Sequence, residues 1–254
     1  MIKRIYVSEL DRHNLSKHKT IEGKARDRFD YRNIVVKKPW GYEYLLFEND
    51  FVAIWVLHLK KSHGTSMHCH PMKKTSLIVL SGKVQSSTLS GWFDLEVLDG
   101  LIIENGVFHS SKALSNNVFI MEIETPPFKK DLVRLKDMYG REGKGYEGKN
   151  KMSRQLNKFN HIFFEENDLV KQEKKRLKSV VINLKYCKSN LLNQEIIKSK
   201  SKRIYSLLEE KIINSSHKQV FGVGYVFLPE DLDKFENIRM YNNCLLLSME
   251  LIKM

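Results

Sequence analysis

The first half of the chain consists of short apolar runs separated by polar residues and glycines. The expected strands cover residues 42–47, 51–59, 76–81, 83–89, 92–98, 101–103 and 118–125. They are rich in β-branched and aromatic residues, which fit the pleated surface of a sheet. Many short strands joined by turns such as Gly82 and Gly106 predict an antiparallel barrel or jelly roll rather than alternating βαβ units.

A different pattern follows a polar stretch rich in Gly and Lys at residues 145–154. Strand-like runs cover residues 179–184, 220–228 and 244–252, and Pro229 marks the start of a short helix. Between residues 190 and 213, apolar residues recur at helical spacing and predict a helix. This part of the chain is therefore expected to form a small α+β unit.

These patterns predict a mainly β fold class, in which a jelly-roll barrel precedes a smaller α+β C-terminal unit. Residues 1–32 form an N-terminal segment, with a short edge strand at residues 5–7. The barrel and its closing strap take up residues 33–147. Residues 155–254 form a small domain whose role the sequence does not reveal.

The composition indicates a folded protein with an anionic partner. Of the 254 residues, 42% are apolar, and 43 Lys and Arg against 30 Asp and Glu leave a formal charge of +13. Such an excess favours anionic small molecules, nucleic acid or a membrane surface. Because the lysines are scattered and form no basic nucleic-acid-binding motif, we interpret them first as a solvated lysine-rich surface and expect no nucleic acid. The net positive charge also suits a small anionic substrate, which we expect as the partner.

Cysteine usage and hydropathy predict where the protein is located. Cys69, Cys187 and Cys244 are far apart and odd in number, which is typical of a reducing compartment rather than of a disulfide framework. No run of about eighteen apolar residues is present that could span a membrane. We therefore expect a cytoplasmic protein without a membrane partner.

Three histidines suggest a metal site. His68 and His70 are two residues apart, so on a strand both point to the same face, and Cys69 points to the other. A third histidine, His109, follows the turn at Gly106. If the two segments lie side by side in a barrel, the three imidazoles converge on one ion. The alternative is a set of polar barrel residues in a site that has lost its ion.

The chain from residue 38 to residue 146 resembles the cupin superfamily. Within it, the chain is most similar to the cupin domain of type II mannose-6-phosphate isomerases. The resemblance covers less than half of the chain. It rests on Lys38-Pro39-Trp40-Gly41, on His68-x-His70 with Thr75 and Gly82, on Glu104-x-Gly106-x-x-His109, and on the closing run DLVRLKDMYGR at residues 131–141.

The resemblance implies a barrel that holds one divalent metal ion on His68, His70 and His109. Two positions depart from the family pattern: Thr75 stands where a glutamate ligand is usual, and Glu104 replaces the proline of the turn. Three histidines are still a sufficient ligand set for zinc or for non-haem iron. Zn, Mn, Fe and Ni all remain candidates.

Further side chains near the histidine strand are candidates for catalysis and for substrate binding. Glu122 and Glu124 share one face of the last barrel strand, where either is a candidate general base if that face is the interior. Lys74 is a third catalytic candidate, since it precedes the vacant ligand position. The candidates for binding an anionic substrate are Lys73, Lys112 and Arg134. For each lysine, the competing interpretation is a solvated surface residue.

The leading functional hypothesis is a metal-dependent isomerase or epimerase of a phosphorylated or nucleotide-linked sugar, in polysaccharide precursor synthesis. One alternative is a three-histidine non-haem iron oxygenase of a small molecule. The other is a sugar-binding cupin without catalytic activity. Under each hypothesis we expect a homodimer, because cupins tend to pair through exposed sheet edges.

Overall fold

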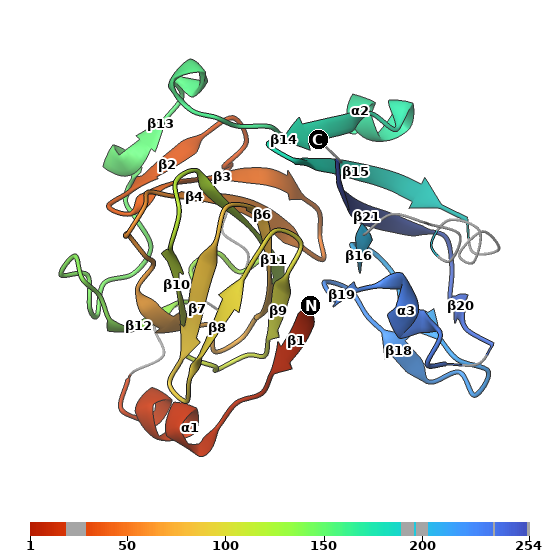
Figure 1. Cartoon of the computed structure of the whole chain (residues 1–254), viewed down its shortest axis with the longest axis horizontal. Coiled ribbons are helices and arrows are strands. Elements are labelled where there is room, and N and C mark those ends of the chain that lie inside the picture. The colour runs from red at the N-terminus through yellow and green to blue at the C-terminus, as the bar shows by residue number, and fades with distance from the viewer. Residues whose placement is uncertain (19–28, 189–195, 197–202, 236, 253–254) are drawn as a thin grey trace.

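The computed structural model describes residues 1–18, 29–188, 196, 203–235 and 237–252. The fold is mainly β, and two sheets, antiparallel except where β1 joins the larger one, form a jelly-roll barrel (Figure 1). The larger sheet has eight strands and makes one wall of the barrel. In spatial order they are β1 (Ile2–Ile5), β9 (Gly100–Ile103), β6 (Lys74–Ser81), β11 (Val118–Thr125), β4 (Ala53–Leu59), β3 (Gly41–Glu48), β2 (Val35–Lys38) and β13 (Met152–Ser153).

The smaller barrel sheet carries the histidine segments. Its five strands are β12 (Val133–Lys136), β5 (Met67–Cys69), β10 (His109–Ala113), β7 (Val84–Thr88) and β8 (Trp92–Leu95). Strands β5 and β10 pair antiparallel with His109 opposite His68. This register brings together two histidines that lie far apart in the sequence.

The N-terminal segment closes one end of this arrangement. Strand β1 extends the larger sheet by pairing in parallel with β9. Helix α1 (Glu9–Ser16) follows, and a capping box between Ser8 and Asp11 starts it. The buried Asp11 accepts a hydrogen bond of 2.9 Å from the backbone N–H of Phe108, next to His109. The helix therefore holds the turn that presents the third histidine.

The C-terminal part forms a third sheet and a small fourth one. The third sheet contains β14 (Lys174–Leu177), β15 (Val180–Cys187), β21 (Cys244–Leu251), β16 (Arg203–Leu207) and β19 (Val226–Phe227). The fourth contains β18 (Gln219–Phe221), β17 (Ile212–Ile213) and β20 (Arg239–Met240). Two short helices, α2 (Glu166–Lys171) and α3 (Pro229–Leu232), accompany these sheets.

Two predicted elements of this part differ from the structure. The helix expected between residues 190 and 213 is wrong from residue 203 onward, where β16 and β17 lie; residues 189–195 and 197–202 are outside the described part. Strand β16 is buried on both faces, so Ile204 and Leu207 imitate helical spacing. The strand expected at residues 220–228 is divided into β18 and β19 by a turn at Gly224, which has φ +74°.

The eight-stranded sheet has a different partner on each face. Its inner face packs inside the barrel through residues such as Leu77, Val79 and Ile120. Its outer face shares one apolar cluster with the third sheet, in which Met121 and Ile123 of β11 join residues of β15 and β21. The barrel and the C-terminal part therefore share a core, and the boundary placed at residue 155 stays a prediction.

Within the described residues, no helix combines the length and the apolar character needed to cross a membrane. Among the described residues, Cys69, Cys187 and Cys244 are buried and form no disulfide.

Candidate metal centre

The three predicted histidines converge inside the barrel. His68 and His70 come from β5 and the residue after it, and His109 begins β10. One ligand nitrogen from each lies within 4.8 Å of the others, and the ring centroids are 4.5 to 5.4 Å apart. His70 and His109 are buried, and His68 is half-buried. The two-residue spacing of His68 and His70 on an extended segment, and the turn at Gly106 before His109, bring the three imidazoles together.

Backbone carbonyls orient each imidazole. Nδ1 of His68 lies 2.7 Å from the carbonyl of Ser66, and Nδ1 of His109 lies 3.0 Å from the carbonyl of Val107. Nδ1 of His70 meets the carbonyl of Asp131 in the same way. If each Nδ1 carries the hydrogen and donates it, each Nε2 is left with a free lone pair, as metal-ligating histidines require.

The electrostatics and burial of the cluster fit a bound cation. Burial is the main reason that the pKa of all three histidines falls below the usual range, and for His68 and His70 it falls well below. The imidazoles are therefore neutral at pH 7, the form that binds metals. The Nε2 of His70 is buried without a hydrogen-bond partner. A divalent ion would satisfy this orphaned atom, so the residues present fit a metal.

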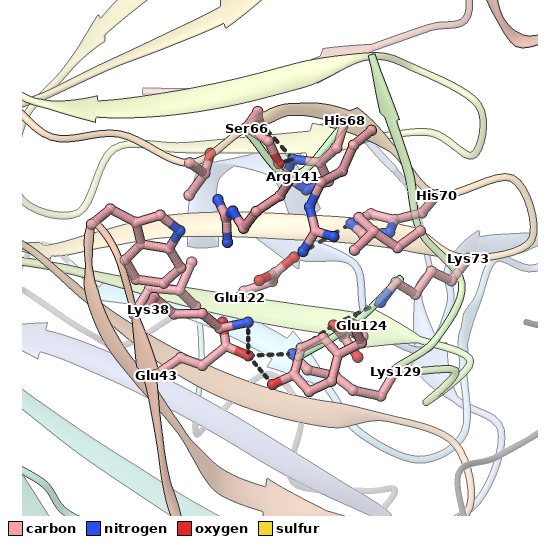
Figure 2. A pocket seen from close by; sticks show the side chains of 16 residues that line it. Lys38, Glu43, Ser66, His68, His70, Lys73, Glu122, Glu124, Lys129 and Arg141 are labelled. Atoms are coloured by element: carbon pink, nitrogen blue, oxygen red, sulfur yellow. Dashed lines mark hydrogen bonds and ion pairs between the residues drawn. The ribbon is translucent and has the colours of Figure 1, made fainter. Parts of the chain in front are cut away.

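A carboxylate faces the same cluster. Glu122 is 7% exposed, and its Oε1 lies 3.7 Å from Nε2 of His70. Figure 2 shows the side chain reaching from β11 toward the histidines. Thr75, where the resemblance to cupins implies a glutamate, is buried on β6, and its hydroxyl has no hydrogen-bond partner in the described structure.

A network of buried ion pairs lines the rest of the cavity. Lys73 Nζ lies 2.7 Å from Glu124 Oε1, and Lys129 Nζ lies 3.4 Å from Glu124 and 3.1 Å from Glu43 (Figure 2). Lys38 pairs with Glu43 at 3.3 Å. Burial opposes ionisation of Glu43, but Lys129 and Lys38 outweigh it and lower the pKa of this carboxyl to about 2.

Two arginines of the predicted strap, Arg134 and Arg141, complete the lining of the cavity. Arg141 lies 2.7 Å from Glu147, and Arg134 donates to the backbone carbonyls of Lys144 and Gly145. Both guanidinium groups line the cavity. The predicted strap therefore returns to the barrel, and Arg134 is held by backbone as well as by charge.

Two hollows meet at this place. The cavity beside the histidines holds about 60 Å³, and a second hollow of about 330 Å³ adjoins it. Leu132 and Tyr146 line both. Lys130, Lys149 and Phe29 line the second hollow.

The structure brings most of the predicted side chains together, but not all of them. Lys73, Glu122, Glu124 and Arg134 line the cavity with His68 and His70, and His109 belongs to the cluster. Lys74 is on the opposite face of β6, where its ammonium lies 3.8 Å from the centre of the Tyr225 ring. Lys112 is exposed on β10. Neither lysine lines the cavity, and their proposed roles gain no support from their positions.

The sequence patterns assign no role in the site to Lys38, Lys129 or Tyr146. On β3, Glu43 alternates with Tyr42 and Tyr44, which belong to the outer-face cluster. That alternation was readable in the sequence, but it does not reveal which face is inside. Lys129 lies in the segment after β11, and no periodic pattern identifies it.

No protein-family model matches the sequence. No curated protein matches it either.

Solved structures that are similar to part of this chain include a cupin-2 domain protein and a protein with a double-stranded β-helix domain. An uncharacterized protein with a double-stranded β-helix domain from Klebsiella pneumoniae is 15% identical, over 47% of this chain and 96% of that one, with a TM-score of 0.34. A cupin-2 domain protein from Shewanella frigidimarina is 20% identical, over 33% and 78%, with a TM-score of 0.30.

A putative sugar phosphate isomerase from Acidithiobacillus ferrooxidans is 15% identical, over 38% of this chain and 67% of that one, with a TM-score of 0.33. Each of these similarities covers less than half of the present chain. The closer resemblance to mannose-6-phosphate isomerases stays a prediction from the motifs.

Proposed function

We propose that this protein is a metal-dependent cupin enzyme of the cytoplasm that isomerises or epimerises a phosphorylated or nucleotide-linked sugar, in polysaccharide precursor synthesis. The observation that carries the proposal is the convergence of three neutral imidazoles beside a buried pair of Lys73 and Glu124. A metal site and a proton-transfer group in one cavity are what aldose–ketose isomerisation needs.

His68, His70 and His109 would hold a divalent ion, which would supply a Lewis acid for the carbonyl of the sugar. Glu124 takes the proton from the carbon next to that carbonyl and returns it to the former carbonyl carbon. The C–H electron pair forms the enediolate, and a proton moves between the two oxygens. Lys73, 2.7 Å from Oε1 of Glu124, fixes the base and leaves Oε2 without a hydrogen-bond partner in the described structure.

The sizes of the two hollows suggest how a substrate is held. The cavity of about 60 Å³ beside the histidines would take the reacting end of a sugar. The anionic remainder would extend into the adjoining hollow of about 330 Å³, where Lys130 and Lys149 provide positive charge.

The test is proton exchange in D2O followed by NMR. The protein is loaded separately with Zn, Mn, Fe and Ni and incubated with hexose 6-phosphates and with nucleoside-diphosphate-linked keto-hexoses. Exchange at the carbon next to the carbonyl supports the proposal, and Glu124→Gln should abolish it. Oxygen consumption with iron and no exchange would favour the oxygenase instead. Tight sugar binding by a metal-free protein would favour the binding module.

We also propose a homodimer that forms through a sheet edge. Strand β8 is an edge strand, and Trp92 on it is 67% exposed. Unpaired edges and exposed aromatic side chains favour association. A monomer in sedimentation velocity at micromolar concentration would contradict this prediction.

A further inference from the structure

Strand β11 carries carboxylates beside residue 75 of β6, where the resemblance to cupins implies a glutamate ligand. Strand β11 lies next to β6, with Glu122 opposite Leu77 and Glu124 opposite Thr75. Thr75, Leu77, Glu122 and Glu124 all belong to the inner face, since Leu77 packs inside the barrel and both glutamates line the cavity. A carboxylate on β11 can therefore reach the cluster that a glutamate on β6 would have reached.

We infer that Glu122 is the fourth, carboxylate ligand of the metal centre, supplied from β11 in place of residue 75. The inference rests on the proposed metal site and assigns one more group to it. The distance of 3.7 Å between Glu122 Oε1 and His70 Nε2 suits two atoms bound to one ion, because ligands about 2.1 Å from a metal lie roughly 3 to 4 Å apart.

The ion pairs of the carboxylates that line the cavity support this assignment. Glu124 pairs with Lys73 and Lys129, and Glu43 pairs with Lys38 and Lys129. Glu122 is the exception among the carboxylates that line the cavity: in the described structure it makes no ion pair with a lysine or arginine and no hydrogen bond. Lys129 attracts Glu122 electrostatically but forms no contact ion pair with it. A buried carboxylate without a contacting cation is costly, so a bound metal would explain its position.

The assignment has a chemical consequence. Three neutral imidazoles and one carboxylate leave a divalent ion with a single net positive charge, which suits an anionic substrate. It also separates the roles of two glutamates on one strand. Glu122 binds the ion, and Glu124, held by Lys73, remains for proton transfer.

Glu122→Gln tests the inference, with Glu124→Gln as the matched control on the same face of the same strand. Chelator-stripped protein is titrated with Zn²⁺ by calorimetry, and with Co²⁺ to record its ligand-field spectrum. Removing a ligand should weaken Zn²⁺ binding about 100-fold or more and change the Co²⁺ bands, because even second-shell changes cost about 10- to 100-fold. Glu124→Gln should change the affinity less than about 5-fold.

A rescue variant makes the test specific. Thr75→Glu in the Glu122→Gln background moves the carboxylate back to β6 and should recover at least about 10-fold of the lost affinity. The metal-free Glu122→Gln protein should be more resistant to urea than the metal-free parent, since an unpaired buried charge has been removed. A residue needed only for folding would give the opposite change.

The outcomes separate the two proposals. If the parent chain binds Zn²⁺ and Glu122→Gln binds it equally well with an unchanged Co²⁺ spectrum, Glu122 is not a ligand, and the metal centre stands with three histidines. If the parent binds neither ion at one equivalent, the proposed metal-dependent function fails, and the assignment of Glu122 fails with it.

Discussion

Both faces of the eight-stranded sheet are buried along its central strand β11, but the two faces differ in chemistry. On β11, Glu122 and Glu124 point into the barrel cavity, and Met121 and Ile123 point to the C-terminal sheet. On β3, Glu43 lines the cavity, and Tyr42 belongs to the outer cluster. Alternate residues of the same strands therefore form a charged site on one face and an apolar interface with the C-terminal sheet on the other.

The difference shows what each kind of burial requires. Apolar side chains on the outer face need only a complementary apolar surface, because the hydrophobic effect is not directional. The charged side chains of the inner face must each find an opposite charge or a metal at a definite place. The inner face is for that reason the one that carries chemistry.

The largest expected effect comes from placing a charge on the outer face. Ile123→Lys should lower the free energy of unfolding by about 5 kcal/mol or more, because Ile123 is 0% exposed and no carboxylate belongs to its apolar cluster. Urea denaturation measures it. Val170→Lys, at a site 83% exposed, should stay within about 0.5 kcal/mol. Equal stabilities would mean that the C-terminal sheet does not cover this face.

Breaking the network of buried ion pairs on the inner face should lower the free energy of unfolding by a slightly smaller amount. Glu43→Gln leaves Lys38 and Lys129 short of a partner and should destabilise the protein by about 3 to 5 kcal/mol. The control is Glu96→Gln, which breaks an exposed pair of 2.8 Å with Lys83 and should cost less than about 1 kcal/mol. Similar losses in both variants would show that burial adds nothing to the network.

The Glu43 network also predicts a pH dependence. The pKa of this carboxyl is about 2 in the folded protein, against an ordinary value of 4.5. Its stabilisation is therefore complete above pH 4.5 and is lost as the pH falls toward 2. The stability difference between the parent and Glu43→Gln should shrink across that window, and a constant difference would contradict the ion pairs.

Binding of a metal ion by the three histidines should stabilise the protein by a smaller amount than the two substitutions above destabilise it. Zn²⁺ at a hundred times its dissociation constant should add about 2.7 kcal/mol and raise the Tm by roughly 5 to 10 °C. Differential scanning calorimetry records the shift, and a chelator should reverse it. His109→Ala should show no shift, and an undiminished shift would place the ion outside the three-histidine cluster.

The smallest effect concerns Lys74, the charged residue that points outward from β6. Burial lowers the pKa of Lys74 to about 8 from 10.5, so Lys74→Met should stabilise the protein by about 1 kcal/mol at pH 7. Between pH 8 and 10.5 the folded chain loses this proton before the unfolded chain does, so the parent gains stability relative to the variant.

Urea denaturation at pH 7 and pH 9.5 measures the stability difference between the parent and Lys74→Met and its change with pH. Substitution of an exposed lysine, Lys112→Met, serves as the control. A pH-independent difference for Lys74→Met would mean that this ammonium is solvated.

Local patterns were sufficient for several features of the fold and the site. Short β-rich runs and glycine turns predicted the jelly-roll barrel, because strand and turn preferences act over few residues. The two-residue spacing of His68 and His70 placed both on one face, and the Gly106 turn before His109 supplied the third ligand. The same local logic failed for β16, where burial on both faces imitated a helix.

The sequence by itself determined the alternation along each strand and therefore which residues share a face. Only the tertiary structure decided which face is the interior. That choice put Glu122, Glu124 and Glu43 in the cavity and Lys74 outside it. It also assembled Lys38, Glu43, Lys73 and Lys129 from distant segments. The reason is physical: a long-range ion pair leaves no local pattern, since its energy depends on a distance that only the packing of the sheets sets.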